Sequence, residues 1–252
     1  MNETIRTLLN HRSIRLYEDK PLTDEEIHLI VRSAQAAASS SFVQAYTIIG
    51  IKDKNMKIQL SALAGNQPYV AANGHLFVFC LDFHRLELAA QLEKVPPEEI
   101  EITLSSTEKF MVGVIDATLA AQNAVVAAES LGLGTVYIGG LRNHLPEVNE
   151  LLGIPSRVVP LFALCVGYPV DLSQKKSRLP LDSIYHEEQY NRNEDLELGR
   201  LAQYNEEISA YYRERTEGVR TERWTAAIAK QLRSPKRLYL KDYLRIQRLP
   251  LD

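Results

Sequence analysis

A short basic cluster near the start of the sequence carries residue types suited to binding an anion. His11, Arg12, Ser13 and Arg15 place an imidazole, two guanidinium groups and a hydroxyl within five residues. Such groups hold a phosphate through charge-assisted hydrogen bonds. The cluster also follows a predicted helix over residues 2–9, and cations at a helix C-terminus complement its dipole without binding any ligand. The cluster alone leaves both interpretations open.

The motifs of several common enzyme classes are absent from the sequence. There is no G-x-G-x-x-G and no G-x-x-x-x-G-K-[ST], so a dinucleotide-binding Rossmann fold or a P-loop is poorly supported. There is no G-x-S-x-G, no H-E-x-x-H and no paired-cysteine site, so hydrolytic and zinc chemistry lack their usual residues. Cys80 and Cys165 each lie in an apolar, strand-like run and are predicted to be buried thiols.

The composition is that of an ordinary soluble protein. Of 252 residues, 45% are hydrophobic and 24% are charged, which disfavours disorder. A net charge of −3 gives no drive toward nucleic acid or an anionic membrane, so neither is expected as a partner. The first fifteen residues are charged and lack the apolar core of a signal peptide, which predicts a cytoplasmic protein.

Apolar periodicity and turn residues predict an alternation of helices with four buried strands. A capping box at Thr23 and Glu26 marks the start of one helix. The predicted strands cover residues 46–51, 75–82, 135–138 and 158–166. The predicted helices cover 2–9, 23–38, 54–64, 84–94, a segment from 98, 108–131, 145–152, 195–214, 221–233 and 236–247. This pattern indicates an α+β or α/β layered domain.

Two segments are expected to need a covering surface. The predicted helix over 108–131 is apolar on nearly every side, and Asp116, Gln122, Asn123 and Glu129 interrupt it, which favours a core or subunit-interface helix over a membrane span. Residues 169–194 show no periodicity and resemble an extended arm. Together they predict a two-fold homodimer.

Six segments, taken in order, resemble the nitroreductase superfamily, specifically its NADPH-dependent nitroreductase and flavin reductase branch. Each is weak alone, but together they span the chain. They are His11–Arg15, Ala38–Ser41 with Gln44 and Ala45, Ala64–Tyr69, Ala128–Gly134 leading to Ile138–Gly140, Gly167–Pro169 and Lys175–Pro180.

The resemblance implies a fold as well as a function. It implies an α+β protein: a three-layer α/β/α sandwich around a central, mostly antiparallel sheet. Residues 1–252 would form a single domain, in which 169–194 are an extended arm and 195–252 a C-terminal helical extension.

The resemblance also implies a bound FMN at the dimer interface, with no catalytic side chain and no metal. The phosphate of FMN would meet His11, Arg12, Lys176 and Arg178, with Ser13 adding a hydroxyl. The ring would meet Arg15, Ser39, Ser41 and Gln67, which match the family positions where reduction builds negative charge. Ile138, Gly139 and Gly140 would bring backbone N–H groups close to the opposite ring edge, although two glycines after a strand also fit a plain turn.

The implied reaction is a ping-pong transfer of a hydride from NAD(P)H, through FMN, to a small-molecule acceptor such as a nitroaromatic, a quinone or free flavin. The sequence does not name the natural acceptor. A non-catalytic FMN-binding redox sensor is the alternative.

A group of C-terminal arginines favours NADPH over NADH, because guanidinium groups suit the 2′-phosphate. Neighbouring glutamates offset much of their charge, so a solvated helix surface is the competing interpretation. The four candidates are Arg213, Arg215, Arg220 and Arg223.

Overall fold

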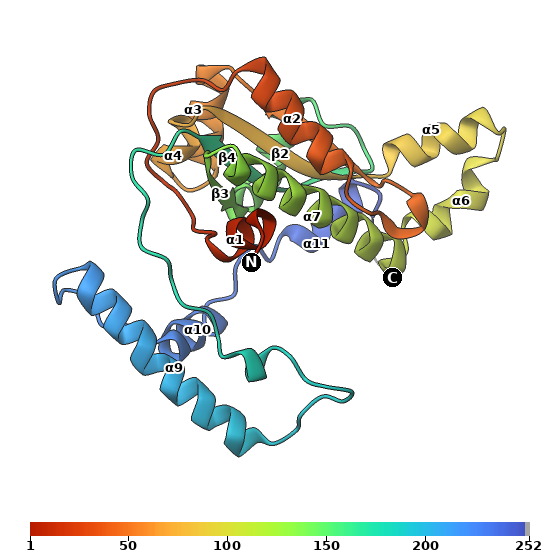
Figure 1. The fold of residues 1–252 in the computed structure, drawn as a ribbon. Coiled ribbons are helices and arrows are strands. Elements are labelled where there is room, and N and C mark those ends of the chain that lie inside the picture. Colours follow the sequence, from red (N-terminus) through yellow and green to blue (C-terminus); the bar gives the residue numbers. More distant parts are fainter. Residues whose placement is uncertain (250–252) are drawn as a thin grey trace. The chain divides into compact units, whose positions relative to one another are not determined.

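The computed structural model describes residues 1–249, and the chain separates into two compact units (Figure 1). The first unit contains residues 1–173 and the segment that begins at Arg237. The second unit contains residues 174–236. Each unit is described by itself.

A four-stranded antiparallel sheet forms the centre of the first unit. Its strands are β1 (Tyr46–Ile51), β2 (His75–Asp82), β3 (Gly134–Ile138) and β4 (Val158–Gly167), in the order β1-β2-β4-β3. Every residue of β2 is buried. The four predicted strands are confirmed to within one residue at each end, because continuous apolar runs mark strands covered on both faces.

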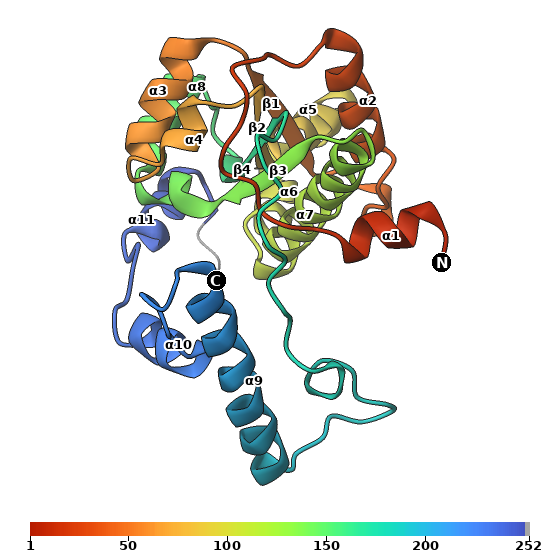
Figure 2. The ribbon, with the colours of Figure 1, turned by 60° about the vertical axis from the view of Figure 1, so that its left-hand side comes forward.

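Helices cover both faces of this sheet (Figures 1 and 2). On one face, α3 (Lys54–Leu63), α4 (Pro68–Ala71) and α8 (Leu145–Leu152) pack on strand residues such as Leu76 and Val78. On the other, α2 (Asp24–Gln35) and α7 (Thr107–Ser130) pack on Phe77 and Phe79. Successive side chains of a strand point to opposite faces, so one strand contributes to both cores. The α+β three-layer sandwich is confirmed.

The helix α7 is apolar and only partly covered. It has the length and hydropathy of a membrane span, with a mean hydropathy of 1.5, and 44% of that stretch is buried. It packs on α2 and β2 and contacts α1 (Glu3–Leu9). Six apolar side chains of α1 and α7 are exposed, and we call this set the α1–α7 surface: Ile5, Leu8, Leu9, Met111, Ile115 and Leu119.

The first unit tests three details of the sequence prediction. The predicted capping box is confirmed, with Thr23 Oγ1 accepting from the Glu26 N–H and Glu26 accepting from the Thr23 N–H. The helix α2 ends at Gln35, before the expected Ala38. Cys80 and Cys165 are free and buried as predicted, and burial raises the pKa of both thiols.

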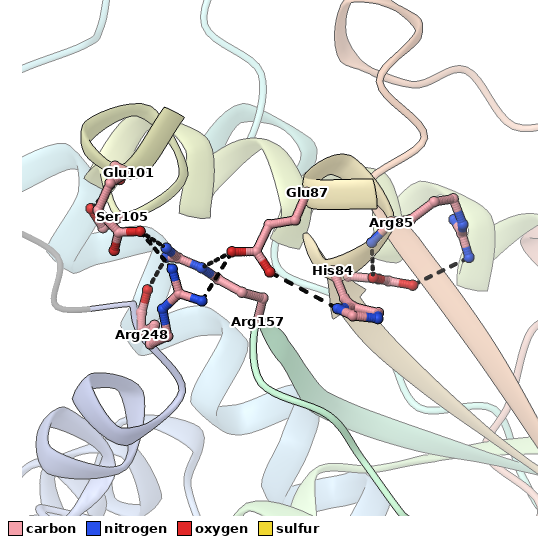
Figure 3. Close-up of polar contacts among 8 residues, drawn as sticks. His84, Arg85, Glu87, Glu101, Ser105, Arg157 and Arg248 are labelled. Atoms are coloured by element: carbon pink, nitrogen blue, oxygen red, sulfur yellow. Dashed lines mark hydrogen bonds and ion pairs between the residues drawn. The ribbon is translucent and has the colours of Figure 1, made fainter. Parts of the chain in front are cut away.

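A buried arginine joins the outer helices α5 (His84–Leu92) and α6 (Pro97–Leu104) to the segment after α11 (Leu240–Ile246) (Figure 3). The Arg157 side chain has no exposed surface and forms ion pairs with Glu87 and Glu101, and it donates to the carbonyl of Arg248. Arg248 pairs with the same two carboxylates at 3.1 and 2.7 Å. Such a buried charge is tolerated because it is paired and hydrogen-bonded.

The second unit is a helical pair preceded by an irregular segment. Its helices α9 (Glu194–Arg215) and α10 (Trp224–Leu232) pack through the rings of Tyr204 and Trp224 and through bonds between Asn205 and Thr225. Between residue 174 and the start of α9, the only helical segment is the single turn Leu181–Ser183. The helices predicted over 195–214 and 221–233 correspond to α9 and α10, and α10 begins three residues later than predicted.

Candidate functional site

The basic cluster lies alongside strand β3. Ser13 forms a parallel bridge with Thr135, and the Ile14 N–H donates to the Thr135 carbonyl at 2.9 Å. Gly134 permits this approach, because a Cβ there would lie 2.8 Å from the Ile14 Cβ. The cluster is thus fixed beside the strand that leads to Gly139 and Gly140.

A carboxylate on α7 orients the imidazole of the cluster. Glu129 Oε1 lies 2.7 Å from His11 Nδ1 and accepts from Thr135 Oγ1 at 2.9 Å. The Glu129 side chain is only 14% exposed. We assigned no role to Glu129 from the sequence, although a carboxylate inside an apolar helix was itself a signal, because a buried carboxylate needs partners.

The guanidinium of Arg12 is held by main-chain carbonyls. Its Nε donates to Asn10 O at 3.1 Å and its Nη1 to Ser173 O at 3.5 Å. Within residues 1–249, Arg12 forms no ion pair, so its charge is not neutralised by a protein carboxylate. Together with Arg6 and Glu129 it lines a cavity of about 320 Å³.

Three of the residues predicted to lie around a flavin ring, Arg15, Gln67 and Gly140, form a second group on the α3–α4 face. Arg15 lies over the Tyr69 ring, 5.8 Å from its centre, and the Tyr69 hydroxyl donates to Gln67 Oε1. The Gln67 Nε2 donates to Ala64 O at 2.6 Å. A Cβ on Gly140 would lie 2.3 Å from that oxygen and 2.5 Å from Gln67 Nε2. The structure therefore brings Arg15, Gln67 and Gly140 together.

Packing within the chain itself accounts for glycine at the turn after β3. The sequence suggested that a side chain there would crowd a ring, whereas in the structure the space beside Gly140 is filled by the chain's own Ala64 and Gln67. At Gly139 a Cβ would lie 3.0 Å from the Arg142 guanidinium. The Ile138 side chain is buried in the core.

Ser39 and Ser41 lie on the opposite side of the sheet from Gln67. Their loop contains left-handed backbone at Ser41, Phe42 and Gln44, with φ of 48°, 57° and 53°. Asp116 of α7, fully buried, holds the loop by accepting from the N–H groups of Ser40 at 2.8 Å and Ala45 at 3.0 Å.

The loop that carries Ser39 and Ser41 and the segment that carries Gln67 lie on opposite faces of the sheet. The loop packs with α7 and α2, and Gln67 precedes α4 on the other face. One chain does not bring the two serines next to Gln67.

The remaining predicted residues belong to the second unit. Lys176 Nζ donates to the Tyr212 hydroxyl at 2.7 Å, and Arg220 lies over the Tyr212 ring at 4.4 Å. Arg178 donates to the Lys176 carbonyl at 3.1 Å. The structure thus groups Lys176 with Arg220, and the grouping of Lys176 and Arg178 with His11 and Arg12 stays a prediction.

The four arginines predicted to bind the 2′-phosphate differ in their contacts. Arg215 donates to the Tyr211 hydroxyl at 3.0 Å, whereas Arg220 is paired with Glu222 at 2.9 Å. Arg213 and Arg223 are exposed and form no ion pair within the described residues.

The donor set of the first unit fits a ligand with an anionic end and a polar ring. In the described part of the chain, the Arg12 guanidinium has no carboxylate partner, and only one ring nitrogen of His11 is bonded. The amide of Gln67 lies beside Arg15 and the backbone of Gly140. These groups suit an FMN, whose phosphate and ring require the two kinds of donor.

Comparison with known proteins gives the family. The nitroreductase family model matches residues 8–168, and the model of its C-terminal domain matches residues 176–252. The chain is 54% identical over 245 residues to a Bacillus subtilis protein named FMN reductase (NADPH), covering 97% of each. It is 42% identical to a Cr(VI) reductase of a Pseudomonas species, covering 94% of this chain and 95% of the relative.

A solved structure of NfrA1 from B. megaterium superposes with a TM-score of 0.95 at 56% identity, covering 98% of each chain. A family model that matches most of the chain, together with relatives that cover nearly all of it, shows the relationship. The chain belongs to the nitroreductase family.

Proposed function

We propose that this protein is an FMN-dependent oxidoreductase that uses NAD(P)H, with a preference for NADPH, to reduce small-molecule acceptors. The acceptors we propose are nitroaromatics, quinones or free flavin, and the protein would act in the cytoplasm. The observation that carries the proposal is the grouping of Arg15, Gln67 and Gly140 in a chain so similar to an FMN reductase (NADPH).

The phosphate of FMN would be held by His11, Arg12 and Ser13 of the first unit and by Lys176 and Arg178 of the second. The bond between His11 Nδ1 and Glu129 keeps the His11 ring in one orientation, and a protonated imidazole would then donate its second N–H to the phosphate. Arg12 supplies a charge that no carboxylate of residues 1–249 neutralises. Hydrogen bonds to a charged group contribute about 1.5–3 kcal/mol each, so a few of them account for selective phosphate binding.

Bound FMN would supply the hydride chemistry, and the chain supplies position and charge. Arg15 and Gln67 are donors suited to an edge of the ring that becomes negative on reduction. Their positions are fixed, since Tyr69 lies under Arg15 and bonds to Gln67. Gly139 and Gly140 would present backbone N–H groups to the ring.

A second copy of the chain would complete the site. Ser39 and Ser41 lie across the sheet from Gln67, so a flavin that meets all three must take the serines from a partner. The exposed apolar α1–α7 surface would be covered in such a homodimer. Burial of apolar area is the main favourable term in association.

The preference for NADPH rests on the second unit. Arg215 and Arg220 lie against the neighbouring rings of Tyr211 and Tyr212, where Lys176 also binds. Arg213 and Arg223 are unpaired on the surface of the described chain. Glu222 competes for Arg220, so the 2′-phosphate would have to displace an exposed ion pair, which solvent screens.

Steady-state kinetics test the proposed function. With NADPH and a quinone, a nitroaromatic or free FMN varied together, we expect parallel double-reciprocal lines, because NADP+ leaves before the acceptor binds. A non-catalytic redox sensor would be reduced by NADPH but would turn over negligibly with every acceptor. Negligible turnover with all three, in protein loaded with FMN, would refute the enzyme and favour the sensor.

A further inference from the structure

A second cavity in the first unit lies apart from every residue predicted to bind FMN. It has a volume of about 600 Å³ and is lined by side chains from residues 17–22, 52–58 and 71–75. This volume falls in the range of small-molecule sites, about 300–1,000 Å³. The helix α4 connects the two regions, since it begins after Gln67 and ends at Ala71 in the cavity wall.

A buried lysine without a counter-ion lines this cavity. Lys57 is only 4% exposed, and its Nζ donates to the Asn73 carbonyl at 2.9 Å. Within residues 1–249 it forms no ion pair, whereas Lys52 and Lys54 of the same wall pair with Asp24 at 2.5 Å and Asp19 at 3.5 Å. Burial lowers the pKa of Lys57, since an ammonium with no anion beside it is costly away from water.

Two further polar groups in the wall have no hydrogen-bond partner in the described chain. His75 is 2% exposed, and neither of its ring nitrogens is bonded. The Oδ1 of Asn73 is also unbonded, and its Nδ2 donates to the carbonyls of Tyr69 and Val70, which fixes the oxygen as the unpaired acceptor. Buried polar atoms are nearly always bonded, so three unpaired atoms and one unpaired charge at one cavity indicate a missing partner.

The chemistry of that partner follows from these groups. The ammonium of Lys57 requires an anion, and the free oxygen of Asn73 requires a donor on the same ligand. The imidazole of His75, neutral or charged, accepts or donates. The lining contains four lysines against two carboxylates, which favours an anion: Lys20, Lys52, Lys54 and Lys57 against Glu18 and Asp19.

We propose that this cavity is a binding site for a phosphate group, taken either as inorganic phosphate or as the monoester of a small metabolite. Hydrogen phosphate carries both anionic oxygens and a hydroxyl, and a monoester adds the hydroxyls of its alcohol. Lys57 would pair with the anionic oxygens, and Asn73 Oδ1 would accept from a hydroxyl. Sulfate has the same shape and charge but no hydroxyl at neutral pH.

Calorimetry on the FMN-loaded protein in phosphate-free buffer tests the proposal. Inorganic phosphate and glycerol 3-phosphate are the probes, and sulfate and glycerol are the controls. We expect binding of at least one phosphate probe, with sulfate clearly weaker and glycerol silent. The tighter of the two phosphate probes identifies the source.

Two matched variants separate a built site from general surface charge. Lys57→Met removes the buried ammonium and keeps the length of the side chain, and we expect the Kd for phosphate to rise about tenfold or more, as for loss of a hydrogen bond to a charged group. Lys54→Met makes the same change one turn away, at an exposed and paired lysine, and should change Kd by less than about twofold. Absence of binding at millimolar phosphate, equal losses in both variants, or equal binding of sulfate would overturn the proposal.

A spectroscopic readout keeps the test independent of the variants' stability. In the parent protein, the imidazole resonances of His75, assigned with a His75→Gln variant, should shift on titration with phosphate and not with glycerol. Unshifted His75 resonances in the presence of saturating phosphate would also refute the site.

Discussion

Asp116→Asn is expected to loosen the loop that carries Ser39 and Ser41. Asp116 is fully buried, and its two oxygens accept from the N–H groups of Ser40 and Ala45. The loop holds three residues other than glycine in the left-handed region, at about 1–2 kcal/mol each, or about 3–6 kcal/mol in total. Two bonds to a carboxylate contribute about 3–6 kcal/mol, which offsets that strain.

Asparagine keeps one acceptor and turns an N–H group toward the second backbone N–H. We therefore expect a loss of about 2–3 kcal/mol in the free energy of unfolding, because one bond to a charged acceptor is lost and a buried donor is left unpaired. Urea unfolding of the flavin-free protein measures this loss. Fluorescence titration measures the second effect, a weaker binding of FMN as the serines move.

The matched control is Glu108→Gln, the same chemical change at an exposed position in the first turn of α7. Its effect should stay within the range for a charge near a helix end, about 0.3–1 kcal/mol. Equal stability of the Asp116→Asn and parent proteins would show that Asp116 does not hold the loop. Reduced stability with unchanged FMN affinity would show that the loop does not meet the flavin.

Four further predictions concern the flavin, the dimer, pH and the nucleotide. Arg178→Ala should weaken FMN binding by about 1.5–3 kcal/mol, whereas Arg15→Ala should mainly slow flavin reduction by NADPH; equal behaviour of the two would contradict their roles. Ile115→Arg, in the α1–α7 surface, should convert a dimer to a monomer in analytical ultracentrifugation, and an unchanged mass would argue against that interface. Burial, with Lys57 and Lys52 nearby, lowers the pKa of His75 from 6.5 to about 4. The unfolded chain therefore binds a proton first, and stability in phosphate-free buffer should fall between pH 6.5 and 4, by on the order of 3 kcal/mol; a His75→Gln variant with the same fall would refute this. Arg220→Ala should raise KM for NADPH and leave KM for NADH nearly unchanged, and equal changes for the two would mark Arg220 as a surface charge.

The layered fold was predictable because its signals are local. β2 and β4 are continuous apolar runs, as expected for strands covered on both faces, and Thr23 with Glu26 marks the start of α2. The early end of α2 and the left-handed conformation of the loop after it were not predictable. Their left-handed residues are held by Asp116, which is distant in sequence, so no local pattern specifies them.

Sequence patterns predicted which residues belong to the candidate site, but not how those residues are arranged in space. The structure groups Arg15 with Gln67 and Gly140, and separates Ser39 and Ser41 from them by the sheet. The sequence gives no such geometry, since these residues come from distant segments.

The supporting residues were missed for the same physical reason. Asp116 and Glu129 interrupt an apolar helix, and their partners, Ser40 and His11, are too distant in sequence to be identified from a local pattern. Lys57 lies in an ordinary polar helix, and only the packing of α3 against residues 71–75 shows that its charge is buried. Burial of a single charged side chain depends on tertiary contacts rather than on helical periodicity.

The visible spectrum of the purified protein, recorded before and after NADPH is added under nitrogen, tests the central claim most directly. The account predicts a yellow protein that releases one FMN per chain on denaturation, and whose flavin absorbance is bleached by NADPH and restored by an added quinone. A colourless protein that takes up no added FMN, or a bound flavin that NADPH does not reduce, would contradict it.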